Sequence, residues 1–164
     1  IGSNQAPKRS YGRVLVVDDD AVTRLILRRW TDHWDLTCEA FGHPNDFMAR
    51  LSGCDFDLAV IDYHLPYMNG LELIEAIRAG QASYGYRLPV FALHTTDSDS
   101  RPAARRCGVQ YFLQKPVCSS ELLFVMKSAG CVPRTTDREI ANLNRVTQLS
   151  VCLNDEANRI MPIR

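Results

Sequence analysis

Residues 58–70 read Leu58-Ala59-Val60-Ile61-Asp62-Tyr63-His64-Leu65-Pro66-Tyr67-Met68-Asn69-Gly70. The apolar run 58–61, closed by the proline and glycine after it, predicts a buried parallel strand. Asp62 ends this strand, so we expect its carboxylate at the carboxyl edge of a sheet. Open α/β sheets bind their ligands at that edge. The stretch therefore predicts both a fold class and the place of a site.

Two other predicted strands also end in charged residues. Upstream, the run 14–17 leads into Asp18, Asp19 and Asp20, and downstream the run 111–114 leads into Lys115 and Pro116. Carboxylates brought this close repel one another unless a cation lies among them, and Mg²⁺ prefers oxygen ligands. With a metal holding one phosphoryl oxygen and Lys115 another, Asp62 would be a nucleophile for phosphoryl transfer.

Strands and helices are expected to alternate along the chain. We expect strands at 14–17, 36–41, 58–61, 89–93 and 111–113, and helices at 21–34, 44–51, 70–79, 101–107 and from 119 or 120 to 130, with a polar loop at 80–88. Asp20 and Ser100 are well placed to cap the helices that come after them. The alternation predicts a doubly wound α/β fold: a flavodoxin-like (βα)5 domain with a five-stranded parallel sheet in the order 2-1-3-4-5.

These features resemble the two-component receiver domain, the CheY-like phosphoacceptor module of response regulators and hybrid histidine kinases. The resemblance runs from about Arg13 to about Ala129. Leu65-Pro66 and Met68-Asn69-Gly70 match the family's turn after the phosphorylated aspartate. Lys115-Pro116 matches its Lys-Pro pair, in which the proline usually follows a cis bond. The resemblance implies that Asp62 is the phosphoacceptor and that Lys115 contacts the phosphoryl group.

The resemblance also implies a bound Mg²⁺ or Mn²⁺ ion. Asp18 and Asp19 match the family's metal-binding acidic pair. In the family the ion is held by the second acid of the pair, by the phosphoacceptor and by the backbone carbonyl two residues beyond it. Here these groups are Asp19, Asp62 and the carbonyl of His64. The family also places the residue at His64 beside the water that attacks the acyl phosphate.

One position departs from the family pattern. Receivers usually carry Thr or Ser at the end of the fourth strand, where the hydroxyl bonds the phosphoryl group and moves the adjacent loop. Counted from Pro89, this position falls on His94, and Thr95 comes next. Thr95 is the expected hydroxyl and His94 the alternative, and with His94 the switch would be altered or absent. Phe112 matches the family's rotating aromatic residue, although an ordinary core role fits it as well.

The composition of the chain argues against nucleic-acid binding and membrane-spanning functions. The 164 residues are 46% hydrophobic and carry 19 basic and 19 acidic side chains, so the formal net charge is +0. This balance gives no reason to expect nucleic acid or an anionic membrane as a partner. No apolar run approaches the roughly 20 residues that span a bilayer. We expect a cytoplasmic domain, with an anchor of the parent protein in the inner membrane left open.

The domain is expected at 13–130, between two segments of different composition. Residues 1–12 are interpreted as a flexible lead or cloning remnant. Residues 131–164 are interpreted as a linker or a helical or disordered tail, or as the start of a following domain. These flanks favour a receiver taken from a hybrid sensor kinase over a stand-alone response regulator, and both stay open. The expected partner is a histidine kinase or a histidine phosphotransfer domain.

Two other classes of function compete with phosphoacceptance. A pseudo-receiver would keep the fold as an interaction module without a working switch, and the His94 departure keeps this alternative open. Haloacid-dehalogenase-type phosphatases also use a strand-end aspartate, but they need a second aspartate two residues later, where this chain has His64. The receiver itself is interpreted mainly as a phosphoacceptor, and kinase activity would belong to the parent protein.

Overall fold

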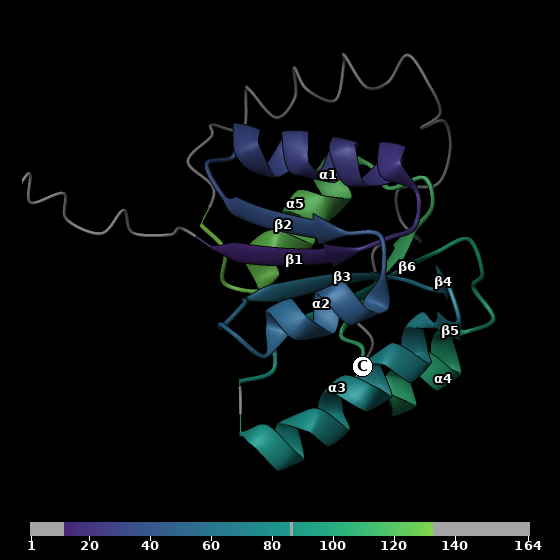
Figure 1. Cartoon of the computed structure of the whole chain (residues 1–164). Helices are drawn as coiled ribbons and strands as arrows, with labels where there is room; N and C mark the ends of the chain where they lie inside the picture. Colours follow the sequence, from purple (N-terminus) through teal and green to yellow (C-terminus); the bar gives the residue numbers. More distant parts are fainter. Residues whose placement is uncertain (1–11, 86, 133–164) are drawn as a thin grey trace, which may run out of the picture.

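A five-stranded parallel sheet forms the centre of the chain, shown as a computed structural model in Figure 1. The structure describes residues 12–85 and 87–132, without the side chain of Tyr84. The strands are β1 (Arg13–Val17), β2 (Thr37–Phe41), β3 (Leu58–Asp62), β6 (Val90–Thr95) and β7 (Tyr111–Gln114). Their order is β2-β1-β3-β6-β7, and every pair is parallel. The predicted order is therefore confirmed.

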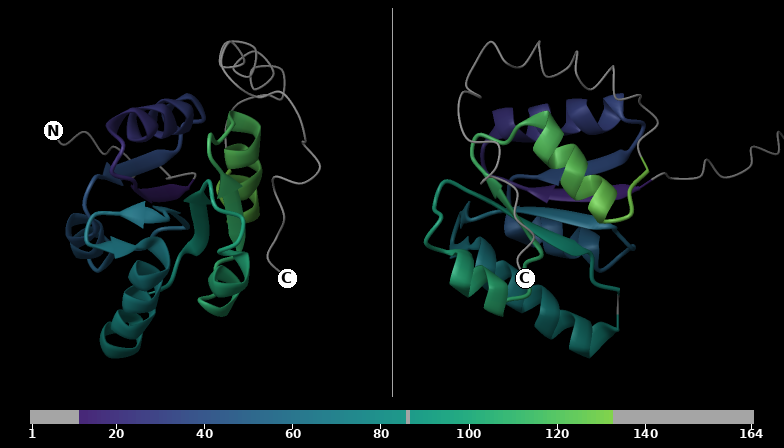
Figure 2. Two further views of the ribbon diagram at one scale, coloured as in Figure 1. Left: turned by 90° about the vertical axis from the view of Figure 1, so that its right-hand side faces the viewer. Right: turned by 180° about the vertical axis from the view of Figure 1, so that it is seen from behind.

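Helices cover both faces of the sheet (Figures 1 and 2). The helices α1 (Ala21–His33) and α5 (Ser119–Ser128) cover one face, and α2 (Pro44–Leu51), α3 (Gly70–Tyr84) and α4 (Arg101–Arg106) cover the other. Successive strand residues point to opposite faces. Val14 and Val16 thus pack under α1 and α5, whereas Leu15 and Val17 pack under α2 and α3. Two-sided burial explains why the central strands β1 and β3 are nearly continuous apolar runs.

A small antiparallel hairpin comes after β3, where the sequence predicts a turn. It pairs β4 (His64–Leu65) with β5 (Met68–Asn69). Tyr67 lies at the tip with φ +69°, a left-handed conformation that is uncommon for an aromatic residue. Gly70 then starts α3 and donates its N–H to the carbonyl of Tyr63 at 2.8 Å. The hairpin brings the chain straight back against the end of β3.

Capping side chains fix where the helices begin. Asp20 accepts from the N–H groups of Val22 and Thr23, as the sequence predicts. Asn69 forms a reciprocal capping box with Glu72 at the start of α3. Ser100 precedes α4, but the expected side-chain cap is wrong, because its hydroxyl donates instead to the carbonyl of Asp97 at 3.0 Å.

Two predicted boundaries need correction. The helix α3 continues past Gly80 and ends at Tyr84, so residues 80–84 are not loop. Gly85 follows it as the C-cap, with a left-handed φ of +71° that a right-handed helix does not contain. The strand β6 runs two residues beyond its predicted end and includes His94 and Thr95. The predicted lead over 1–12 and the tail over 131–164 fall almost entirely outside the described residues.

Gly70 offers a test of the junction between β3 and the hairpin. A Cβ atom added there would lie 2.5 Å from the carbonyl oxygen of Asp62 and 3.0 Å from Leu93 Cδ1. We expect Gly70→Ala to lower the free energy of unfolding by about 1–3 kcal/mol, because the backbone must shift. Urea unfolding measures the change.

Gly53→Ala is the matched control, because its Cβ would meet only ordinary contacts, the nearest being the Arg50 carbonyl oxygen at 3.6 Å. We expect it to change stability by no more than about 0.5 kcal/mol. Equal stability of the two variants would show that the junction is not tightly packed.

Candidate phosphoacceptor site

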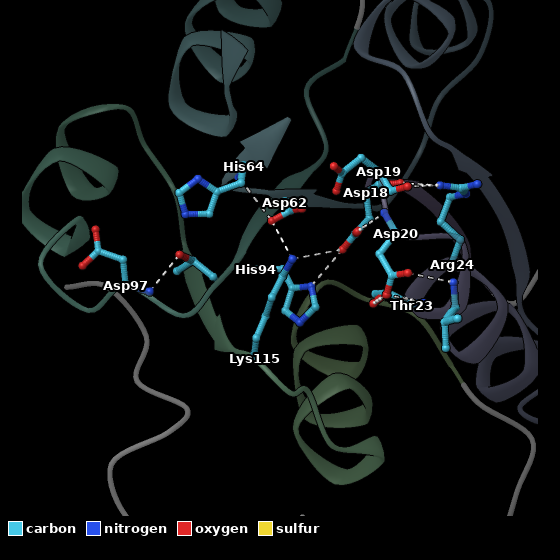
Figure 3. A network of polar contacts seen from close by, with 12 residues as sticks. Asp18, Asp19, Asp20, Thr23, Arg24, Asp62, His64, His94, Asp97 and Lys115 are labelled. Atoms are coloured by element: carbon cyan, nitrogen blue, oxygen red, sulfur yellow. Dashed lines mark hydrogen bonds and ion pairs between the residues drawn. The ribbon is translucent and has the colours of Figure 1, made fainter. Parts of the chain in front are cut away.

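Three strand ends meet at one edge of the sheet (Figure 3). Asp62 is the last residue of β3, Asp18 follows β1 and Lys115 follows β7. The carboxylates of Asp18 and Asp62 are almost fully buried, each with 1% of the residue exposed. The topology brings them together because β1 and β3 are neighbours in the sheet.

Lys115 contacts both buried carboxylates. Its Nζ lies 2.8 Å from Asp62 Oδ1 and 3.5 Å from Asp18 Oδ2. The peptide bond between Lys115 and Pro116 is cis, as the resemblance implies. One ammonium group thus serves two anions, and the ammonium points into the site, not into bulk solvent.

His94 adds a fourth polar group to the site. In the register of β3 and β6 it pairs with Asp62, and its Nδ1 lies 3.3 Å from Asp18 Oδ2. Thr95, one residue later, accepts a hydrogen bond on Oγ1 from the N–H of Asp97 at 3.0 Å. Of the two candidates for the switch position, His94 therefore lies among the carboxylates (Figure 3). The Thr95 hydroxyl is instead engaged with the β6–α4 turn.

Asp19 completes an acidic cluster. One carboxylate oxygen from each of Asp18, Asp19 and Asp62 lies within 4.8 Å of the others. Asp19 is exposed at the mouth of the site, and Asp62 Oδ2 is buried without a hydrogen-bond partner in the described part of the chain. Three carboxylates facing a single ammonium fit a hard divalent cation such as Mg²⁺, which binds oxygen ligands and keeps several waters.

The backbone around the acidic pair is held in place by Arg24. Its Nη1 donates to the carbonyl of Asp18 at 2.7 Å and to that of Asp19 at 3.0 Å. Asp18 Oδ1 accepts the N–H of Asp20 at 2.9 Å. These contacts fix the loop between β1 and α1, so the acidic side chains start from a rigid backbone.

Burial and charge shift the pKa values of the site in opposite directions. Burial raises the pKa of Asp62, and repulsion by Asp18 adds to this, outweighing the attraction of Lys115. Burial also opposes ionisation of Asp18, but the contacts with His94, the Asp20 N–H and Lys115 hold its pKa below the usual value. Although burial works against it, the pKa of Lys115 is raised by both carboxylates.

The two partners of the Asp62–Lys115 pair thus both have raised pKa values, although pairing alone would lower that of the acid. The difference follows from the neighbours of each group. Asp62 faces a second carboxylate, Asp18, whose repulsion adds to the effect of burial, whereas Lys115 is attracted by both carboxylates, which together outweigh its own burial.

Other residues singled out in the sequence lie around this centre. The N–H of His64 donates to Asp62 Oδ1 at 3.2 Å, and the role of its carbonyl oxygen as a metal ligand stays a prediction. Phe112 is buried in the core beneath the guanidinium of Arg101, 4.8 Å from the ring centre.

Sequence reasoning missed the contact between His94 and Asp18 and the role of Arg24. Arg24 lies one helical turn beyond Asp20, a spacing that places it on the same side of α1, and this signal could have found it. No local pattern connects His94 with Asp18, because the two lie 76 positions apart.

The family model described as the response regulator receiver domain matches residues 14–127. The chain therefore belongs to this family, the receiver domains of two-component phosphorelays. One relative is the sensory/regulatory protein RpfC of Xanthomonas campestris, 30% identical over 112 residues. The match covers 68% of this chain but only 15% of RpfC.

Solved structures share the fold. The chemotaxis response regulator CheY4 of Vibrio cholerae has a TM-score of 0.64 at 22% identity, over 72% of this chain and 98% of that one. A second match is to a chain in the co-crystal structure of the Saccharomyces cerevisiae histidine phosphotransfer protein Ypd1 with the receiver domain of Ssk1. Its TM-score is 0.68 at 19% identity. That match covers 76% of this chain and 92% of the matched chain.

The raised pKa of Asp62 predicts how stability depends on pH without metal. At a pH above this pKa, the folded state must hold Asp62 as an unfavourable buried charge. At a pH below the pKa of Asp62 in the unfolded chain, the carboxyl group is protonated in both states and this cost is absent. In EDTA we expect Asp62→Asn to raise the free energy of unfolding at pH 7 by on the order of 1 kcal/mol. The gain should shrink as pH falls through the pKa of Asp62.

Urea unfolding between pH 7 and pH 4 measures this difference, with substitution of the exposed loop residue Asp55 by Asn as the control. A less stable Asp62→Asn protein at pH 7 would mean that the ion pair with Lys115 outweighs burial and repulsion.

Proposed function

We propose that this chain accepts a phosphoryl group from a phosphohistidine on Asp62, with Mg²⁺ or Mn²⁺ bound at the acidic cluster. The observation that carries the proposal is the state of the Asp62 carboxylate. One oxygen is bound by Lys115 at 2.8 Å, and the other is buried without a partner in the described residues. A carboxylate held in this way presents a single oxygen for reaction.

Each residue of the site would have a separate role in phosphoryl transfer. An Asp62 oxygen attacks phosphorus, forming a P–O bond as the P–N bond to the donor imidazole breaks, and the imidazole leaves with the electron pair and is protonated. Lys115 acts as a point charge on the phosphoryl oxygens. Asp18, Asp19, Asp62 and the His64 carbonyl would hold the metal, which would neutralise charge on the transferred group.

The phosphodonor is proposed to be a histidine kinase or a histidine phosphotransfer domain. The parent protein is proposed to be a hybrid histidine kinase, with a stand-alone response regulator as the alternative, and the site to lie in the cytoplasm. Among the described residues, no helix has the length and apolar character needed to cross a bilayer. RpfC is far longer than the matched segment, which supports a receiver carried within a larger protein.

His94 supports a second candidate, a pseudo-receiver that keeps the fold but does not switch. Its imidazole occupies the register position opposite Asp62 and binds Asp18. A chain whose Asp62 is never modified would favour this second candidate, so phosphoacceptance is the first property to test.

Incubation with acetyl phosphate and Mg²⁺ tests phosphoacceptance. We expect intact mass spectrometry to show one added phosphoryl group, lost on omitting Mg²⁺. Asp62→Asn should abolish the addition, because the amide lacks the nucleophilic oxygen. Lys115→Met should slow it by about 10²-fold or more, the scale of losing one charge-stabilising contact.

Asp55→Asn is the matched control, since it removes an exposed aspartate outside the cluster and should be phosphorylated like the wild type. Phosphorylation that persists in Asp62→Asn would refute the assignment, and a wild type that is never modified would favour the pseudo-receiver.

Metal binding should stabilise the folded chain. At a Mg²⁺ concentration 100 times the dissociation constant, we expect the free energy of unfolding to rise by about 2.7 kcal/mol over its value in EDTA. Asp19→Asn should lose most of this gain without disturbing the core, because the Asp19 side chain is exposed. Urea unfolding with and without Mg²⁺ checks this, and an equal gain in both proteins would place the ion elsewhere.

A further inference from the structure

His94 is committed to a partner before any phosphoryl group arrives. Its Nδ1 lies 3.3 Å from Asp18 Oδ2, and both side chains are buried. A carboxylate can only accept hydrogen bonds, so Nδ1 carries the hydrogen and donates it. The ring is thus turned to Asp18 and not to Asp62, its neighbour in the strand register (Figure 3).

Asp18 is held by the N–H of Asp20, by His94 and by Lys115, and of these Lys115 alone also contacts the phosphoryl group in the proposed function. Oδ1 accepts the N–H of Asp20 at 2.9 Å, and Oδ2 faces both His94 and Lys115. If His94 swung toward a phosphoryl group, the buried Asp18 Oδ2 would lose the nearer of its two donors, which is costly away from water. A ligand moves a residue only by binding better to the moved state, and here the resting contact opposes the movement.

The neighbouring turn is tied down as well. The hydroxyl of Thr95 accepts the N–H of Asp97 at 3.0 Å, and the Thr95 carbonyl accepts the N–H of Lys115 at 2.9 Å. Because side chains alternate along a strand, Thr95 and His94 point to opposite faces of the sheet. The hydroxyl therefore stabilises the turn between β6 and α4 and does not point toward the carboxylates.

The first residue of α4 is anchored to the core through Phe112. The guanidinium of Arg101 lies 4.8 Å from the centre of this ring, and Phe112 itself is 1% exposed. A cation over an aromatic face is attracted to it. Contacts at His94, Thr95 and Arg101 thus hold β6, the following turn and the start of α4 in the resting arrangement.

We propose that His94 is a positioning residue that holds Asp18 in place and insulates the phosphoacceptor pocket from the β6–α4 segment. Loading of Asp62 then leaves residues 96–107 where they are, and a partner reads the loaded state at the pocket itself. This inference rests on the proposed function, because it concerns the response of the chain once Asp62 is loaded.

Amide NMR of the wild type with Mg²⁺ and beryllofluoride tests the insulation directly. We expect saturable shifts at residues 18–20, 62–65 and 115–117, whereas residues 96–107 shift no more than the remote helix α2. In His94→Thr, which frees Asp18 and supplies a hydroxyl opposite Asp62, the shifts should extend into residues 96–107. Large shifts of that segment in the wild type would overturn the inference.

Metal affinity tests the positioning role separately. His94→Ala removes the donor to Asp18 and should weaken Mg²⁺ binding by about tenfold or more, as loss of a group that orients a ligand does. His94→Asn keeps a donor near the place of Nδ1 and should restore affinity to within about threefold of the wild type. Calorimetric titration measures both, and equal affinities in Ala, Asn and wild type would refute the role.

Failure of this inference is distinguishable from failure of the proposed function. If beryllofluoride causes no saturable shift around Asp62 in the wild type, the phosphoacceptor assignment fails. If it shifts the pocket and the β6–α4 segment together, the assignment stands and the insulation by His94 fails. The wild-type spectrum decides this even if a His94 variant does not fold.

Discussion

Lys115 places one ammonium group against two buried carboxylates, and the chemistry of the site depends on this imbalance. Its Nζ lies 2.8 Å from Asp62 Oδ1 and 3.5 Å from Asp18 Oδ2. A single cation cannot neutralise both anions and the nearby Asp19, so the pocket retains negative charge. Such a site attracts a divalent cation, and without that cation the ionised form of Asp62 is only partly stabilised. The same arrangement therefore supports metal binding and reactivity.

The parallel sheet makes this arrangement possible at little cost to the core. All strands run in one direction, so their charged ends collect at one edge while their apolar residues pack on both faces. Arg24 fixes the backbone of the acidic pair, and Gly70 lets the hairpin return against the end of β3. Arg24 and Gly70 thus help to position the carboxylate groups although neither residue contacts them.

Much of the fold could be predicted because its signals are local. The apolar run before Asp62 and the three charged strand ends define the sheet and its functional edge. The end of α3 could not be predicted, because Gly80 resembles a helix C-terminus, whereas the helix ends only before Gly85. The choice between His94 and Thr95 could not be settled either, since a shift of one residue moves a strand side chain to the other face. Only the pairing of β3 with β6 shows which of the two lies beside Asp62.

The membership of the receiver family and the geometry of the pocket support the same chemistry. His94 is the residue at which this chain departs from the expected pattern. A histidine bound to Asp18 lies where the family resemblance leads us to expect a hydroxyl that binds the phosphoryl group. The charge imbalance can be measured most directly by following the carboxyl carbons of Asp18 and Asp62 by NMR during a pH titration in EDTA. Asp62 should titrate above the ordinary aspartate range and Asp18 below it. Two carboxyl groups that titrate together in the ordinary range, or in the reverse order, would contradict the account.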